Sequence, residues 1–110
     1  MAGKTMKISE ADFSLQVEDL LNLYGWLWVH NRPARTEKGW RTALSGYKGF
    51  PDYVAVKHGE LLFIELKGDS GKLTPDQDTW NEELSKTGAT VGVFYPNDIE
   101  VLRQILAGEA

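Results

Sequence analysis

Two acidic residues face each other across a predicted β-hairpin in this chain. Segments 52–57 and 60–67 are rich in aliphatic, aromatic and β-branched residues, and they flank His58-Gly59, a pair typical of a two-residue turn. A turn of that length fixes the antiparallel register and places Asp52 opposite Glu65. Directly opposed side chains have Cβ atoms about 4.5–5.5 Å apart, and like charges there are destabilising. A divalent cation would offset this repulsion.

A lysine completes the charged group. Lys67 follows Glu65 by two residues, so its side chain points from the same face of the sheet. The other residues on both faces of the hairpin are mostly apolar, and we expect other elements to cover both faces. Partly buried carboxylates are costly unless they are paired or bind a metal. Asp52, Glu65 and Lys67 are therefore the candidate catalytic and metal-binding residues.

The whole chain has the size and composition of one globular domain. We expect a single domain over residues 1–110, with a flexible lead-in at 1–8 and a frayed tail at 107–110. The sequence has no cysteine, which excludes disulfides and thiolate zinc sites and is compatible with a cytoplasmic location. No apolar run of membrane-spanning length and no signal peptide is recognisable, so we expect no membrane partner.

The charge is unevenly distributed. The net charge of −4 argues against a protein that coats nucleic acid by bulk electrostatics. The segment 31–48, however, holds five basic residues against the single acid Glu37, and the five are Arg32, Arg35, Lys38, Arg41 and Lys48. We read it as a loop without sustained periodicity, in which Trp40 and Tyr47 lie among the basic residues. Such a loop either contacts DNA phosphates and bases or is simply solvated.

A helix and a strand precede this loop. Apolar residues at helical spacing predict a helix over 10–24, with Ser9 as its N-cap and Gly25 after its end. Residues 26–30 read as a strand. Glu10 lies in the first helical turn, where an acid either complements the helix dipole or reaches the charged group on the hairpin.

A polar loop and a second helix follow the hairpin. The loop 68–73 lacks the glycine and hydroxyl positions of a phosphate-binding P-loop, although Lys72 remains a candidate phosphate contact. Thr74-Pro75 is a strong helix start, and Gln77 is the third residue after the cap. The amide of Gln77 either completes a capping box with Thr74 or points toward the sheet.

A strand over 90–95, which we expect to be buried, and a last helix complete the chain. The order is helix, three strands, helix, strand, helix, which predicts an α/β fold with a mixed sheet and helices on both faces.

These residues, taken together, resemble the PD-(D/E)xK nuclease superfamily, whose fold is restriction-endonuclease-like. Within it they resemble the VRR-NUC family, especially small stand-alone members encoded by bacteriophages. The resemblance runs from about residue 10 to 106 and lies in Gly49-Phe50-Pro51-Asp52, Glu65-Leu66-Lys67, and Leu73-Thr74 followed by Gln77, Trp80 and Gly88.

The resemblance implies a magnesium- or manganese-dependent nuclease that acts on branched or flapped DNA, such as a Holliday junction, and functions as a homodimer. It implies that Asp52, Glu65 and the main-chain carbonyl of Leu66 bind metal and that Glu10 is an outer or second-metal ligand. Glu18, in the same predicted helix, competes with Glu10 for that role. Lys67 would orient the attacking water or stabilise phosphoryl charge, and Gln77 would hold Lys67 or the water.

Two other functions remain open from the sequence. The same fold could serve as a catalytically silent DNA-binding or interaction module. Alternatively, Asp52 and Glu65 could be the acid and nucleophile of a glycosidase, although Lys67 and the basic loop suit phosphate better.

Overall fold

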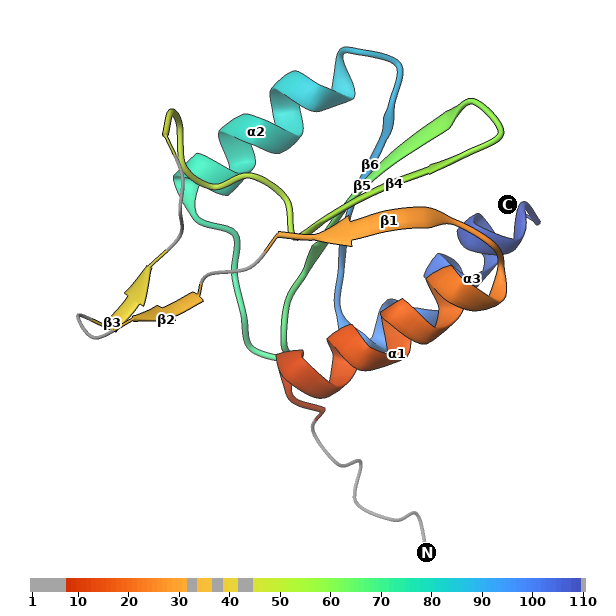
Figure 1. Cartoon of the computed structure of the whole chain (residues 1–110), viewed down its shortest axis with the longest axis horizontal. Helices are drawn as coiled ribbons and strands as arrows, with labels where there is room; N and C mark the ends of the chain where they lie inside the picture. Colours follow the sequence, from red (N-terminus) through yellow and green to blue (C-terminus); the bar gives the residue numbers. More distant parts are fainter. Residues whose placement is uncertain (1–7, 32–33, 37–38, 42–44, 110) are drawn as a thin grey trace, which may run out of the picture.

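The computed structural model describes residues 8–31, 34–36, 39–41 and 45–109, with only the backbone described in 34–36 and 39–41. It is an α/β structure with three α-helices, six strands and one 3-10 turn (Figure 1). In chain order they are α1 (Glu10–Leu23), β1 (Leu27–His30), β2 (Ala34–Thr36), β3 (Gly39–Arg41), β4 (Tyr53–Lys57), β5 (Glu60–Leu66), α2 (Pro75–Ser85), β6 (Thr90–Phe94), η1 (Pro96–Asp98) and α3 (Ile99–Ala107).

The main sheet is mixed, as predicted, with strand order β1-β4-β5-β6. The first three strands are antiparallel and β6 runs parallel to β5, so α2 is the crossover between these two strands. The predicted hairpin register is confirmed, since Lys57 pairs with Glu60 and Tyr53 with Ile64. Both turn residues have positive φ, 48° at His58 and 81° at Gly59, as a type I′ turn requires.

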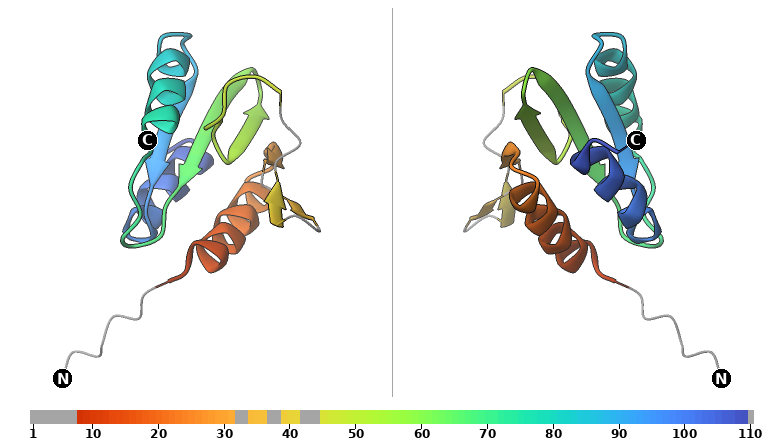
Figure 2. Two further views of the ribbon diagram at one scale, coloured as in Figure 1. Left: turned by 90° about the vertical axis from the view of Figure 1, so that its left-hand side faces the viewer. Right: turned by 90° about the vertical axis from the view of Figure 1, so that its right-hand side faces the viewer.

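Helices cover both faces of this sheet. In Figure 1, α1 and α3 lie on one face and α2 lies on the other. Figure 2 shows the same layers from the two sides, with α2 alongside β6. The core lies between α1, α3 and the first face, where Phe13, Leu21, Tyr53, Ile64 and Leu102 are fully buried.

The second face is less covered than expected. Of its apolar residues, Phe63 is buried near α2, but Val56, Leu61 and the neighbouring Leu27 and Val29 of β1 are exposed. Strand β6, expected to be buried, is a half-exposed edge strand. None of the side chains of α2, all of them described, is fully buried. The cause is that α2 packs along the edge strand β6 and leaves the side of this face formed by β1 and β4 uncovered.

The basic segment contains structure that the sequence did not predict. Strands β2 and β3 pair antiparallel, with Arg35 opposite Trp40, and form a ribbon outside the main sheet (Figure 1). The expectation of a loop without regular structure is therefore wrong at 34–36 and 39–41. Strands of three residues are too short to leave a detectable periodicity.

The ends of the helices follow local rules. The hydroxyl of Ser9 accepts a hydrogen bond from the amide of Asp12, which confirms the predicted cap of α1. Residues 107–109, expected to fray, instead close α3. Gly108 adopts φ 77°, and the Glu109 amide donates to the carbonyl of Gln104. Among the described helices, none has the length and apolarity needed to cross a bilayer.

Candidate active site

Asp52 and Glu65 meet at the open end of the β4–β5 hairpin. The strand pairing ends at Tyr53 and Ile64, and Asp52 and Glu65 are the next residues of the two segments, near enough for the charge of Asp52 to raise the pKa of Glu65. Oδ2 of Asp52 accepts a 2.8 Å hydrogen bond from the backbone amide of Leu66, and the carbonyl of Asp52 accepts one of 2.7 Å from the amide of Asn31. Asp52 is thus held by the strands on both of its sides.

Glu65 is a buried carboxylate with one free oxygen. Its residue is only 2% exposed. Oε2 accepts a hydrogen bond of 3.2 Å from Nε2 of Gln77, whereas Oε1 has no hydrogen-bond partner among the described residues. Burial, the charge of Asp52 and a hydrogen bond that a protonated Glu65 would share with Asp52 raise the pKa of Glu65 to about 9, against the lowering effect of Lys67. Without a cation, burial and the proximity of the two acids therefore favour a proton held by the Asp52–Glu65 pair.

Lys67 extends from the end of β5 toward the same pair. It is 9% exposed, and Nζ donates a 2.8 Å hydrogen bond to Oε1 of Gln77. Nζ also lies 3.9 Å from Oε2 of Glu65. The prediction that Asp52, Glu65 and Lys67 share one face is thereby confirmed.

Gln77 performs both of the roles that the sequence left open. Its backbone amide donates to Oγ1 of Thr74, and its Oε1 accepts from the Thr74 amide over 3.0 Å, so the capping box is present. The same side-chain amide links Lys67 and Glu65. The first turn of α2 therefore positions the lysine beside the carboxylates.

The segment before Asp52 is fixed against the same helix. Gly49 has φ 95°, and a Cβ there would lie 2.7 Å from the backbone carbon of Asp76. The indole Nε1 of Trp80 donates to the carbonyls of Tyr47 and Lys48 over 3.1 and 3.0 Å. The sequence alone does not predict this anchoring role of Trp80, because the partners of the indole are backbone atoms distant in the chain. Only glycine fits where the chain approaches α2 this closely.

The two glutamates of α1 have different surroundings. Glu10 is exposed and lies next to Gly68, and its charge contributes to raising the pKa of Glu65. Oε2 of Glu18 instead accepts a 2.6 Å hydrogen bond from the Tyr53 hydroxyl and lies 3.0 Å from Nδ1 of His30. Burial and this hydrogen bond raise the pKa of Tyr53. Glu18 is thus engaged on the opposite side of the sheet, which leaves Glu10 as the acid of α1 nearer the site.

The donor set fits a hard cation only in part. Across residues 8–31, 34–36, 39–41 and 45–109, no three Asp, Glu, His or Cys side chains are grouped as metal ligands. Two carboxylates, one of them with a buried and unpartnered oxygen, suit magnesium, which usually takes one or two carboxylates and completes its shell with water and phosphate. Metal binding by Leu66 and Glu10 stays a prediction.

Of the residues predicted to contact DNA, Lys48 and Lys72 have described side chains. Lys48 is 82% exposed, and its Nζ lies 3.6 Å from Oδ2 of Asp76 in a surface ion pair. Lys72 is exposed in the loop after β5. Arg32 and Lys38 lie outside the described residues, and only the backbone is described for Arg35 and Arg41, which belong to the β2–β3 ribbon.

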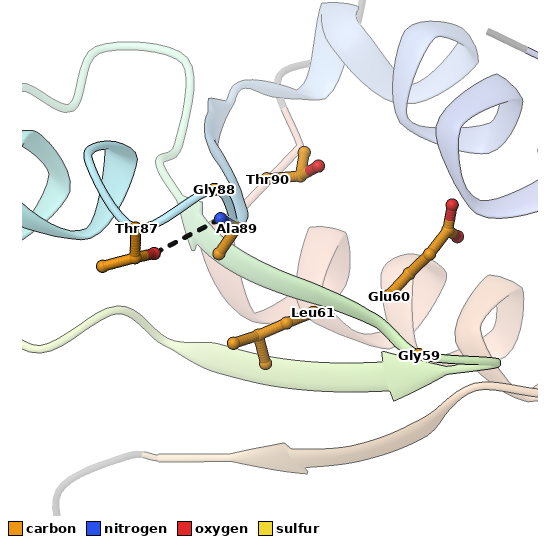
Figure 3. A pocket seen from close by; sticks show the side chains of 7 residues that line it. All are labelled: Gly59, Glu60, Leu61, Thr87, Gly88, Ala89 and Thr90. Carbon is orange, nitrogen blue, oxygen red and sulfur yellow. Dashed lines mark hydrogen bonds between the residues drawn. The ribbon is translucent and has the colours of Figure 1, made fainter.

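A hollow of about 470 Å³ lies at the other end of the hairpin, between the start of β5 and the loop before β6 (Figure 3). It is lined by Gly59, Glu60, Leu61, Thr87, Gly88, Ala89 and Thr90. Besides backbone groups and the Thr87 and Thr90 hydroxyls, it offers the single carboxylate of Glu60. It therefore lacks the paired acids and the lysine of the candidate active site.

Comparison with known proteins adds no relative. No family model matches the chain, and neither the curated proteins nor the solved structures include a significant match.

Proposed function

We propose that this protein is a divalent-metal-dependent DNA endonuclease of the VRR-NUC type, with a restriction-endonuclease-like fold. The observation that carries the proposal is the environment of Glu65. This carboxylate is buried near Asp52, one of its oxygens has no partner within the described part of the chain, and Lys67 lies beside it. Such an arrangement is unfavourable for stability alone, because two acids share a site that excludes water. It is suited to a hard cation bound together with a phosphate.

The bound Mg²⁺ or Mn²⁺ would neutralise charge on the phosphoryl oxygens and lower the pKa of a water molecule. Asp52 and Glu65 would hold it through oxygen atoms. Lys67 would orient the attacking water or stabilise negative charge on the phosphoryl group. Gln77, which contacts Lys67 and Glu65 at once, would keep the ammonium at its place while the carboxylate changes its protonation state.

The proposed substrate is DNA with a branched or flapped structure, such as a Holliday junction. The exposed Lys48 and Lys72 are the proposed phosphate contacts among the described side chains, and Arg32, Arg35, Lys38 and Arg41 of the basic segment are proposed as further contacts. The proposed location is the cytoplasm of a bacterial host, with the protein encoded by a bacteriophage.

A homodimer is proposed as the active form. Leu27 and Val29, which are 74% and 58% exposed, lie with Val56 and Leu61 on one face of the sheet beside the edge strand β1. A second copy would cover this apolar surface. Val29→Lys should convert a dimeric mass in solution to a monomeric one, whereas Val101→Lys, at an exposed position of α3, should leave the mass unchanged.

Cleavage of a substrate panel tests the main proposal. Labelled junction, flap, single-stranded and duplex DNA would be incubated with magnesium, manganese or a chelator. We expect metal-dependent cleavage by the wild type and none by Asp52→Asn or Lys67→Ala, both of which should remain folded. The control Asp78→Asn removes an exposed acid of α2 and should cut normally.

Other outcomes point to the alternatives. Metal and DNA binding without cleavage of any substrate would support a silent DNA-binding module with the same fold. Glycoside hydrolysis that chelators do not inhibit would support a glycosidase in which Asp52 and Glu65 are the acid and nucleophile. Metal-dependent cutting by purified Asp52→Asn would remove the proposed site.

A further inference from the structure

A small apolar hollow lies between α2 and the segment that leads to Asp52. It has a volume of about 180 Å³ and is lined by Tyr47, Thr79, Trp80 and Glu83. Tyr47 is 55% exposed, so one aromatic wall is open to solvent. The proposed nuclease chemistry makes no use of this hollow.

The indole wall and the backbone that carries Tyr47 are held in place. The N–H of the Trp80 indole is occupied by the carbonyls of Tyr47 and Lys48. The ring of Phe50 packs edge-on against Trp80 with centroids 5.0 Å apart, and Phe50 in turn packs edge-on against Phe63 of β5. The backbone carrying Tyr47 is thereby fixed to α2. A flat ligand would meet a preformed surface there, with little loss of conformational entropy.

An exposed cation lies beside the hollow. The side chain of Lys48, the residue after Tyr47, is 82% exposed, and its Nζ makes only a surface ion pair of 3.6 Å with Asp76, which a phosphate can replace. The one acid in the lining, Glu83, is paired with Lys86 over 2.8 Å, so its negative charge is offset. A base needs an apolar aromatic surface and its phosphate needs a nearby cation.

Helix α2 connects this hollow to the candidate active site. Gln77, which holds Lys67 and Glu65, precedes Trp80 by about one helical turn. Gly49 packs against the backbone at Asp76 and leads directly to Asp52. A strand with a phosphate at the carboxylates could therefore place a neighbouring nucleotide over the hollow.

We propose that Tyr47 and Trp80 form a stacking site for an unpaired nucleobase of the DNA substrate, with Lys48 contacting the adjacent phosphate. This inference rests on the proposed nuclease function. In duplex DNA the bases are stacked on each other and are not available to the hollow, whereas a flap or an open junction arm presents them freely. The stacking site thus gives the enzyme a preference for DNA with unpaired nucleotides.

The test uses the full chain in calcium, an oxygen-binding cation, so that binding can be measured separately from cleavage in magnesium. The probe is a flapped DNA with 2-aminopurine in the unpaired arm, compared with a duplex of the same length. Tyr47→Ala should weaken flap binding about tenfold and abolish the fluorescence quenching caused by stacking. Tyr47→Phe should behave as wild type, and duplex binding should be equal in all three proteins.

The outcomes separate this proposal from the nuclease proposal. If the wild type binds and cuts flapped DNA while Tyr47→Ala has the same affinity and the same quenching, the stacking site is overturned and the nuclease stands. If the wild type binds no DNA, both are overturned. Should Tyr47→Ala fail to fold, Tyr47→Leu replaces it, because leucine is apolar but cannot stack, and we expect the same loss.

Discussion

Lys67 donates a 2.8 Å hydrogen bond to Gln77, and this contact joins the end of β5 to the first turn of α2. The partner amide also donates to Glu65 and caps its own helix. One side chain thus couples the folding of α2 to the position of the ammonium group in the candidate active site.

Removal of this amide should affect cleavage more than stability. Gln77→Ala loses the contacts to Lys67 and Glu65. Mutation of a residue that orients a metal ligand typically lowers metal affinity or activity about 10- to 100-fold. We therefore expect a loss of cleavage in that range, with a fall in the free energy of unfolding of about 1 kcal/mol. Cleavage rates and chemical denaturation would be measured side by side.

Thr74→Ala is the matched control for this prediction. It removes the hydroxyl that caps α2 and should cost about 0.5–2 kcal/mol, but it leaves the link between Gln77, Lys67 and Glu65 in place. Equal loss of cleavage in Gln77→Ala and Thr74→Ala would mean that only the helix cap matters.

The buried carboxyl group should make the metal-free protein less stable as the pH rises. Folding raises the pKa of Glu65 from 4.5 to about 9, so between these values the folded protein holds a proton that the unfolded chain has released. Its contribution to stability is complete below pH 4.5 and is lost toward about pH 9. The loss is at most about 1.4 kcal/mol per pH unit.

Glu65→Gln isolates this effect, because glutamine resembles the protonated acid and does not titrate. With chelator present, the free energy of unfolding of the wild type should fall from pH 5 to pH 9 relative to that of the variant. In magnesium, the wild type should regain stability at high pH, since the cation binds the deprotonated form, while the variant should not. Parallel curves for the two proteins would contradict the raised pKa.

The sequence predicted the parts of this site that depend on local rules. A two-residue turn and the alternating pattern of the hairpin suffice to bring Asp52 close to Glu65, because register is fixed once the turn is known. The cap of α2 at Thr74 is likewise a local signal, and the structure has it.

The sequence could not predict what depends on packing between distant segments. Whether Gln77 reaches Lys67 is set by how α2 packs on the sheet, and the exposure of Val56 and Leu61 follows from the packing of α2 against β6 rather than over β4. The sequence also left both Glu10 and Glu18 as candidates for the outer or second-metal ligand. Only the contacts of Glu18 with Tyr53 and His30 assign it to the opposite side of the sheet.

These contacts predict opposite consequences for the two glutamates. Glu18→Gln replaces a charged acceptor of two hydrogen bonds and should lower the free energy of unfolding by about 1–3 kcal/mol, without changing cleavage by the folded protein. Glu10→Gln alters an exposed residue and should change stability by less than about 0.5 kcal/mol. It should nevertheless weaken metal binding and cleavage, because it removes a negative charge near Glu65.

Calorimetric titration of metal and thermal unfolding would measure the two effects separately. The assignment of Glu10 to the site would be reversed if Glu18→Gln were stable but bound metal poorly while Glu10→Gln bound metal normally.

The last prediction concerns the salt dependence of DNA binding. Each phosphate contact that is lost should lower the slope of log K against log salt by about 0.9 on duplex DNA and about 0.7 on a single strand. We expect Lys48→Ala to lose one such contact, and charge reversal at Arg35 or Arg41 to weaken binding further. Arg103→Ala is the control, since it removes a charge on α3, on the other face of the sheet, where Arg103 pairs with Glu100 and Glu109. If all four variants keep the wild-type slope, the basic residues are merely solvated and DNA must be held elsewhere.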